Sequence, residues 1–517
     1  MSTLPLARRA LMRVTSPTFA VITAATLALS AGVFTTVPAS ASHLATTPRA
    51  PRYTPKFEPG PCAADLPNDP RVECGVLTVP ENRDRPQRAQ VQLPVATVRS
   101  QAATKAPDPI VHLAGGPGQA AFPILNFVLA TDLGGPRDVI VLSQRGTAAS
   151  TPNLDCPELT DATWAQFATA DGPAVEQRSF DTVVRACRAR LRASGVDLNS
   201  YNTITNAADV ADLRLALGVR NWNIWSLSYG TALAQEVMRD HPDGLRSVVL
   251  DSTGPPDTGF GGTDEVRRAM DSIKRLVAGC ATSPACHAAH PTLARDLTDV
   301  VAALDAQPYQ SVVTEPGSGA QRAIAFTGRD LIYGLVNIPR ISSLISQFPQ
   351  LVSQFKAGQY GFIDTLASTL IPQLYTTSDG MHLSVQCADR AHIDVQAGLR
   401  RLLAAHPEYK GVGTGVFAAC PAWPVRPVAR SFNQPVTSAI PTLVLAGEWD
   451  PTTPAKPARE VAKRLKRSSF VEFPGLGHVV VRFNNPCPQS LLQGFIANPT
   501  QRPDTTCVSQ LPEPAWS

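Results

Sequence analysis

The sequence predicts an α/β protein, in which a mostly parallel sheet is covered by helices on both faces and carries a helical insertion. Short apolar runs alternate with helical segments along the chain, as parallel strands buried on both faces do. Several runs end in glycine or polar residues, the sequence expected where strands end beneath a ligand site. A long stretch of amphipathic helical segments separates the earlier runs from the later ones.

The N-terminal segment predicts export. Three arginines stand before an apolar, uncharged stretch over residues 19–33, and the small residues Ala39-Ser40-Ala41 follow it. This order is typical of a cleaved signal peptide, here residues 1–41, and the shortness of the stretch favours cleavage over a membrane anchor. The Arg8-Arg9 pair leaves the twin-arginine and the general export routes open. A flexible leader is expected over residues 42–60, and the mature protein is expected to be secreted.

Composition argues against some classes of function. The formal net charge is +4, and three of these positive charges come from Arg8, Arg9 and Arg13 of the predicted signal peptide. The remaining chain is near neutral and holds no basic block, which argues against nucleic acid as its partner. After the signal peptide, no stretch of the sequence is apolar and long enough to span a bilayer. A length of 517 residues fits a large core with an insertion, or two domains.

The ten cysteines predict five disulfides, because an even number of cysteines in an exported protein is typical of a disulfide framework. Cys286, His287 and His290 would also suit a metal ion. The sequence has no second ligand cluster at a suitable spacing, which favours a short disulfide loop and no metal. The cysteines fall into close sequential pairs, and the expected bridges are Cys62–Cys74, Cys156–Cys187, Cys280–Cys286, Cys387–Cys420 and Cys487–Cys507.

The first part of the core is expected over residues 61–254. The helix expected over Asn206–Leu217 carries Val210 and Leu213 at helical spacing, and Gly218 ends it. The strands expected in this part, besides the one discussed next, are Gly75–Val79, Val91–Val98, Ile110–Leu113, Asp138–Leu142 and Arg246–Leu250.

One turn inside this part carries most of the functional information. The apolar run Asn221–Leu227 leads into Ser228-Tyr229-Gly230, and a helix-forming segment, Ala232–Arg239, follows. A serine on a tight turn between strand and helix is the arrangement of a nucleophile elbow, which exposes the hydroxyl above the sheet. The usual pattern has a glycine two residues before the nucleophile, where this chain has Ser226. By itself, the turn is equally compatible with an ordinary helix cap.

A helical cap is expected over residues 255–380. Segments such as Glu265–Val277 and Leu293–Leu304 have the apolar spacing of amphipathic helices. Inserted at the C-terminal edge of the sheet, they would cover the site that the strands create, and an unrelated helical domain is the alternative. The C-terminal part of the core is expected over residues 381–517.

Two later strands supply an acid and a base. Asp450 follows the apolar run Thr442–Ala446, and His478 lies in a glycine-flanked loop after Ser469–Phe473. Serine hydrolysis needs a histidine that accepts the hydroxyl proton and a carboxylate that orients this histidine. The chain order Ser228, Asp450, His478, each after a strand, predicts a catalytic triad, which requires neither metal nor cofactor.

The oxyanion of such a reaction needs two backbone N–H donors. Tyr229, the residue after the nucleophile, is expected to supply one. The other is expected from Gly116 in the loop Gly115-Gly116-Pro117-Gly118, because Pro117 has no N–H. Glycine allows this backbone to approach a substrate without a Cβ in the way.

With these motifs, the chain resembles secreted α/β-hydrolases of the tripeptidyl aminopeptidase and proline iminopeptidase group, which are serine exopeptidases. The resemblance runs from about residue 60 to the C-terminus. It implies the α/β-hydrolase fold, the triad Ser228, Asp450 and His478, and a helical cap over the site. The matching motifs are Glu73–Arg83, Gly115–Gly118, Gln144–Thr147, Ser228–Thr231, Gly447–Pro454 and Gly477-His478.

Three residues depart from the family pattern. Ala114 stands in place of a histidine before the glycine loop, Ser143 in place of an aspartate, and Ser226 in place of the first glycine of the elbow. None belongs to the predicted triad, so we expect these departures to bear on substrate preference.

Two enzymatic functions fit this triad. An exopeptidase that acts from the N-terminus must bind an α-ammonium group with a carboxylate; Asp389, Glu448 and acidic cap residues are candidates, with a solvated surface charge as the alternative for each. The first hypothesis is a secreted aminopeptidase that releases short peptides or N-terminal residues. The second is a secreted carboxylesterase or lipase-like hydrolase, because ester and peptide hydrolysis share the acyl-enzyme. A binding protein on an inactive hydrolase fold is disfavoured by the intact triad.

Overall fold

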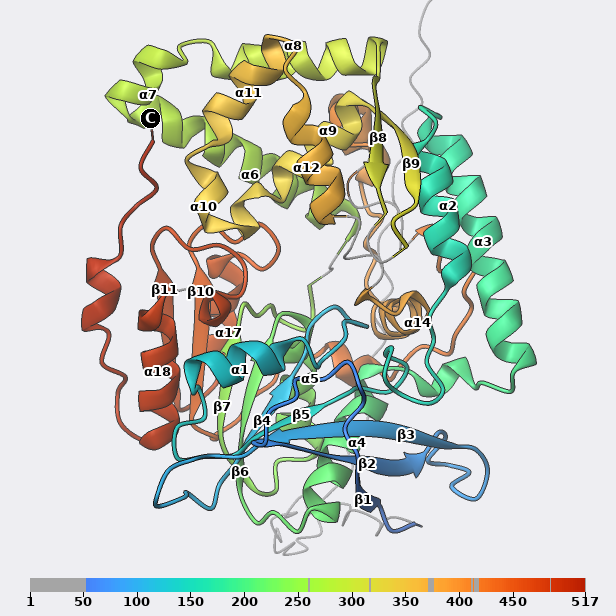
Figure 1. Cartoon of the computed structure of the whole chain (residues 1–517), viewed down its shortest axis with the longest axis vertical. Helices are drawn as coiled ribbons and strands as arrows, with labels where there is room; N and C mark the ends of the chain where they lie inside the picture. Colours follow the sequence, from blue (N-terminus) through green and yellow to red (C-terminus); the bar gives the residue numbers. More distant parts are fainter. Residues whose placement is uncertain are drawn as a thin grey trace, which may run out of the picture. The chain divides into compact units, whose positions relative to one another are not determined.

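The computed structural model describes residues 53–516, apart from 259–260, 316–317, 371–375, 411, 413–417 and 484 (Figure 1). The predicted signal peptide and most of the predicted leader lie outside the described residues. Within the described part, no helix has both the length and the apolar character that a membrane span requires.

The core is a nine-stranded sheet in the order β1-β2-β3-β5-β4-β6-β7-β10-β11. The pairs from β1 to β5 are antiparallel, and the pairs from β5 to β11 are parallel, which confirms the predicted mostly parallel sheet. The strands are β1 Lys56–Gly60, β2 Val72–Pro80, β3 Gln90–Val98, β4 Ile110–Leu113, β5 Val139–Leu142, β6 Trp222–Leu227, β7 Leu245–Asp251, β10 Thr442–Gly447 and β11 Ser468–Phe473.

Helices cover both faces of this sheet because successive side chains of a buried strand point to opposite faces. In β4, Val111 packs in one apolar cluster and Ile110 in another. The first cluster includes buried residues of α4 (Thr203–Ala216), α5 (Tyr229–Asp240) and α17 (Ala455–Arg464); the second includes those of α1 (Ile124–Thr131) and α18 (Pro486–Ala497).

The strand β1 lies inside the segment that was expected to be a flexible leader, so the sequence-based boundary at residue 60 is placed too late. β1 pairs with β2 in antiparallel register. The ring of Phe57 lies over Gly75, where a Cβ would come within 2.3 Å of the ring carbon Cζ. Glycine at this position makes room for the ring, and the contact draws residues 56–60 into the sheet.

The insertion forms a cap with an apolar core of its own, and Figure 1 shows it gathered on one side of the sheet. Besides the expected helices, the cap holds an antiparallel hairpin, β8–β9, which the helical spacing did not predict. Its elements are α6 Gly262–Thr282, α7 Pro284–Ala289, α8 Leu293–Ala306, β8 Tyr309–Thr314, β9 Gln321–Phe326, α9 Gly328–Val336, α10 Ser342–Ile345, α11 Phe348–Lys356 and α12 Gly361–Leu370.

The apolar core of the cap also draws in residues from outside 255–380. Trp164 of α2 (Pro157–Phe167) is buried in it, and so are Leu399 of α15 (Leu399–Ala405) and Tyr409. α2 is followed by α3 (Pro173–Ala193). Three stretches of the chain therefore contribute to this core, together with Trp449 from the loop after β10.

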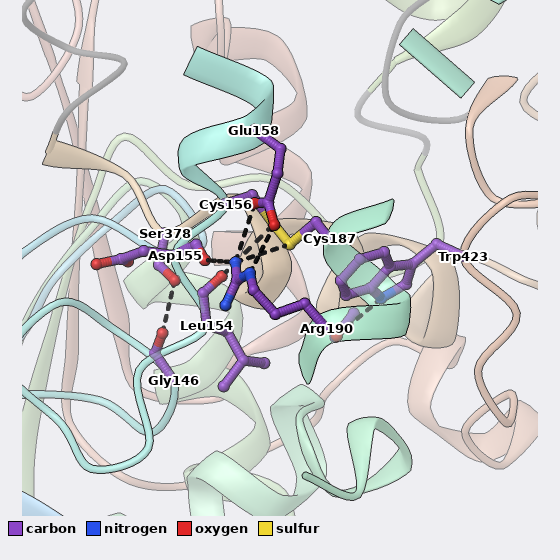
Figure 2. Close-up of a disulfide and its surroundings, with 10 residues drawn as sticks. Gly146, Leu154, Asp155, Cys156, Glu158, Cys187, Arg190, Ser378 and Trp423 are labelled. Carbon is purple, nitrogen blue, oxygen red and sulfur yellow. Dashed lines mark hydrogen bonds and ion pairs between the residues drawn. A yellow bond between two sulfur atoms is a disulfide. The ribbon is translucent and has the colours of Figure 1, made fainter. Parts of the chain in front are cut away.

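The five disulfides join the same cysteine pairs that sequential pairing predicted: Cys62–Cys74, Cys156–Cys187, Cys280–Cys286, Cys387–Cys420 and Cys487–Cys507. Figure 2 shows the Cys156–Cys187 bridge, beside which Arg190 of α3 pairs with Glu158 of α2 at 2.5 Å. Cys286 is bridged, so it offers no thiolate to a metal ion, and Nδ1 of His290 bonds to Ser353 Oγ at 2.8 Å.

Candidate active site

The turn between β6 and α5 holds Ser228 in a backbone conformation that is rare for non-glycine residues. Its φ is 51° and its ψ is −121°. Such strained conformations gather at functional sites. The turn is tightly packed, because a Cβ on Gly230 would lie 2.2 Å from the carbonyl oxygen of Leu113 at the end of β4. The backbone N–H of Ser228 donates to the carbonyl oxygen of Asp251 at 2.9 Å, which ties the turn to the end of β7.

Ser226, which replaces the usual first glycine of the elbow, points into the sheet and away from the site. Its side chain is fully buried, and its hydroxyl donates to the carbonyl oxygen of Val249 at 2.8 Å. The hydroxyl is therefore satisfied in the interior. A serine fits at this packing position without altering the turn that follows.

The structure brings His478 and Asp450 into direct contact. Nδ1 of His478 lies 2.8 Å from Oδ2 of Asp450. Asp450 is buried and also accepts the N–H groups of Thr452 at 2.8 Å and Thr453 at 2.9 Å, with a further bond from the Thr453 hydroxyl at 2.7 Å. Burial raises the pKa of Asp450, but His478 and the Thr453 donors outweigh this effect and hold the pKa below its usual value. The carboxylate is thus ionised and fixed beside the imidazole.

A second carboxylate, Asp251 at the end of β7, anchors the chain directly after His478. Its two oxygens accept the backbone N–H groups of Val480 and Val481, both at 3.0 Å. Asp251 is fully buried, and burial raises its pKa to about 7. This role could not be predicted from the sequence, because an aspartate after a strand has the same pattern as a turn residue.

The glycine loop lies against the candidate nucleophile. A Cβ on Gly115 would be 3.1 Å from the Cβ of Ser228, and Gly116 has a φ of 110°. Gly115 brings the backbone of the loop close to the serine, and a Cβ on Gly116 would lie 2.7 Å from the backbone nitrogens of Gly118 and Gln119. Ala114, which precedes the loop, is held by the amide of Gln144, which donates to its carbonyl oxygen at 2.9 Å.

The helix α14 (Asp379–Asp389), together with the residue before it, holds this glycine loop in place. The N–H of Ser378 donates to the carbonyl oxygen of Gly118 at 2.8 Å. Nδ1 of His382 lies 2.9 Å from the carbonyl oxygen of Pro117, so Nδ1 carries the proton, because a carbonyl only accepts. Burial lowers the pKa of His382, which keeps the imidazole neutral and makes its Nε2 an acceptor.

Ser228 opens into a cavity of about 510 Å³ whose walls come from both the core and the cap. A larger cavity of about 830 Å³ lies among α6, α8 and α9 of the cap, and Ser228 does not line it. The residues that line the cavity at Ser228 include Gly116, Pro117, Tyr229, Gly261, Glu265, Arg268, Tyr333, Asn337, Arg340, His382, Gln386, Asp389, Arg390, Phe432, Pro451 and Thr452.

The structure separates the two acidic residues that were predicted to bind substrate. Asp389 lines the cavity, and its carboxylate accepts the hydroxyl of Thr203 at 2.5 Å. Glu448 forms an ion pair with Arg275 and accepts the N–H of Gly475 at 3.1 Å. Glu448 does not contribute to the cavity wall. Through Arg275 of the cap helix α6 and Gly475 after β11, it joins the cap to the loop that follows β11.

A third acidic residue, Glu265 of the cap, lines the cavity and was not singled out from the sequence. Burial raises the pKa of Glu265, although the neighbouring Arg268 lowers it in part. The sequence signal for this residue was its place near the start of an amphipathic helix, which does not by itself tell which way the side chain faces.

Comparisons with known proteins agree with this architecture. Residues 108–307 match the model of the alpha/beta hydrolase fold, and residues 410–507 match the model described as TAP-like protein. These matches define the class: the chain is an α/β-hydrolase and an enzyme of the serine hydrolase type. The curated proteins to which the chain is similar, at 23–24% identity, include a serine protease and a tripeptidyl aminopeptidase.

Two curated relatives and one solved structure illustrate the similarity. Serine protease Hip1 of Mycobacterium tuberculosis is 24% identical over 463 residues, which cover 83% of this chain and 86% of the relative. Tripeptidyl aminopeptidase of Streptomyces lividans is 23% identical over 480 residues, which cover 86% of each chain. A crystal structure of proline iminopeptidase from Mycobacterium smegmatis is 15% identical with a TM-score of 0.39, covering 82% of this chain and 98% of that one.

Proposed function

We propose that this chain is a secreted aminopeptidase that releases short peptides or N-terminal residues through an acyl-enzyme on Ser228. The observation that carries this proposal is that Ser228 and the cap carboxylate Glu265 line the same cavity. A peptide whose cleaved carbonyl lies at Ser228 would find a partner for its α-ammonium group at Glu265. The names of the relatives, a serine protease and a tripeptidyl aminopeptidase, support peptide substrates.

In the proposed mechanism, His478 accepts the proton of Ser228 as the hydroxyl attacks the carbonyl carbon. Asp450, 2.8 Å from Nδ1 of His478, orients the ring and stabilises the imidazolium. The N–H groups of Gly116 and Tyr229 stabilise the oxyanion. His478 then protonates the leaving amine. In the second half of the reaction, His478 accepts a proton from water as the water attacks the acyl-enzyme, and returns a proton to Ser228 as the acyl group leaves.

The proposal is tested with a fluorogenic panel that contains free mono-, di- and tripeptidyl amides, the same compounds with blocked N-termini, and short acyl esters. Cleavage that depends on the free N-terminus supports an aminopeptidase, whereas activity on esters alone would show a carboxylesterase. Ser228→Ala must abolish every activity in the panel. Retained turnover in this variant would reject Ser228 as the nucleophile.

The role of Glu265 is tested with Glu265→Gln, which keeps the shape of the side chain and removes its charge. We expect a rise in KM for free peptides of about tenfold or more, with a smaller change for N-blocked esters. Asp264→Asn is the matched control, because Asp264 is its sequence neighbour and pairs with Arg267 at 3.6 Å outside the cavity wall. An equal effect of both substitutions would contradict the assignment.

A further inference from the structure

The acidic and basic side chains that line the cavity at Ser228 are not equal in number. Five of them line it, two acidic and three basic: Glu265, Asp389, Arg268, Arg340 and Arg390. Glu265 and Arg268 interact electrostatically, and so do Asp389 and its neighbour Arg390. Arg340 is the basic group left over from these two couplings. An enclosed site with an uncompensated guanidinium favours an anionic group on its ligand.

Arg340 lies beside the loop that carries His478. It ends the short helix η2 (Ile338–Arg340), which follows α9. A Cβ on Gly477 would lie 1.8 Å from the carbonyl oxygen of Pro339 and 3.1 Å from the carbonyl carbon of Arg340, so the two backbones are in contact. The N–H of Gly477 also donates to the hydroxyl of Ser342 at 3.0 Å. The cap segment with Arg340 is thereby fixed against the catalytic histidine.

The guanidinium of Arg340 is available to a ligand. Among the residues that the structure describes, no carboxylate pairs with it and no side-chain hydrogen bond fixes it. Tyr333 of α9 lies in the same wall, with 47% of its surface exposed. Burial raises the pKa of the Tyr333 phenol, Glu265 raises it further and Arg340 lowers it in part, so both charges lie within electrostatic reach of this ring. The cavity wall thus holds an acidic residue, Glu265, and a basic residue, Arg340, near the exposed ring of Tyr333.

The position of Arg340 assigns the part of the substrate that it would meet. In the proposed mechanism His478 protonates the leaving group, so the wall next to His478 faces the leaving-group side of the cleaved bond. A planar guanidinium recognises a carboxylate through paired N–H donors.

We infer that Arg340 binds a carboxylate on the leaving-group side of the substrate, so that the enzyme prefers short peptides that carry a negative charge just beyond the cleaved bond. This inference rests on the proposed peptidase function. The carboxylate is either the free C-terminus of a short peptide or an acidic side chain of the first residue after the cleaved bond. Both sources have the same chemistry, and the substrates below distinguish them.

The experiment compares the wild type with Arg340→Gln and Arg340→Lys on matched peptides with free N-termini. One peptide ends in a neutral leaving residue with a C-terminal amide, the second has a free C-terminal carboxylate, and the third has an amidated C-terminus and an acidic leaving residue. A peptidyl coumarin amide, whose leaving group is neutral, measures the basal reaction. Arg267→Gln is the matched control, because Arg267 lies on α6, is exposed and does not line the cavity.

We expect the wild type to cleave at least one carboxylate-bearing peptide with a kcat/KM about 10- to 100-fold above that of the neutral peptide. In Arg340→Gln this ratio should fall close to one, Arg340→Lys should keep part of it, and Arg267→Gln all of it. Equal rates for charged and neutral peptides in the wild type would overturn the inference. An equal loss on all substrates, the coumarin amide included, would also overturn it. Activity of the wild type on the coumarin amide leaves the proposed function standing in either case.

Discussion

The contacts of Asp450 predict that Asp450→Asn will inactivate the enzyme through the tautomer of His478. Oδ1 of Asp450 accepts two backbone N–H groups, from Thr452 and Thr453, whereas Oδ2 faces Nδ1 of His478. In asparagine, only one side-chain atom is an acceptor, and the two backbone donors hold it at the Oδ1 position. The amide NH₂ group then points at Nδ1 and donates to it. The ring proton moves to Nε2, the nitrogen that must receive the proton of Ser228.

The expected loss in kcat is about 10⁴-fold, or about 5.5 kcal/mol of transition-state stabilisation, the size found when an aspartate of a serine triad is replaced by asparagine. Initial rates with the best substrate of the fluorogenic panel measure this loss, and circular dichroism checks that the variant is folded. A variant that keeps about a tenth or more of the wild-type kcat would refute the tautomer argument, because the wrong tautomer removes the general base.

Thr453→Ala serves as the control for Asp450→Asn. It removes the hydroxyl that donates to Oδ2 of Asp450 at 2.7 Å but keeps the carboxylate and both backbone donors. His478 therefore keeps its proton on Nδ1, and we expect a loss in kcat of about tenfold or less. If Thr453→Ala lost as much activity as Asp450→Asn, general disturbance of this loop would explain both.

Three further substitutions test the packing around the site. Gly230→Ala places a Cβ 2.2 Å from the Leu113 carbonyl oxygen, so the unfolding free energy from urea titration should fall by about 1–3 kcal/mol and kcat should fall with it. Ser226→Gly removes the bond to Val249 and should cost about 1–2 kcal/mol with kcat unchanged. Burial raises the Asp379 pKa from 3.8 to about 7. The unfolding free energy that this group contributes is therefore fully present below pH 3.8 and is lost as the pH rises through 7. In Asp379→Asn this decline with pH should be smaller.

Most strands of the sheet could be predicted from the sequence because the signal of a buried strand is local, whereas β1 was missed. The central strands β4, β5 and β10 are mostly apolar and buried along their whole length, and Ser228, Asp450 and His478 each stand a few residues after a strand. The parallel arrangement then places the ends of these strands at one edge of the sheet, where Asp450 and His478 meet at 2.8 Å.

The residues that sequence reasoning missed depend on contacts between distant parts of the chain. Asp251 acts through backbone N–H groups more than two hundred positions away, and Glu265 depends on how a cap helix is rotated. Glu448 was chosen because it stands close to Asp450 in sequence, but residues two apart at the end of a strand need not face the same space. Its partner, Arg275, belongs to the cap.

Elements outside the sheet contribute to the geometry of the reaction as well as to the shape of the cavity. Ser378 and His382 bond to carbonyl oxygens of the glycine loop that is proposed to hold the oxyanion. The hydroxyl of Ser342 in the cap accepts the N–H of Gly477, beside His478. The glycine loop and the loop that carries His478 are therefore both held by residues outside the sheet. A substitution that loosens either contact should lower kcat for small neutral substrates too, which a cap that only selected substrates would not do.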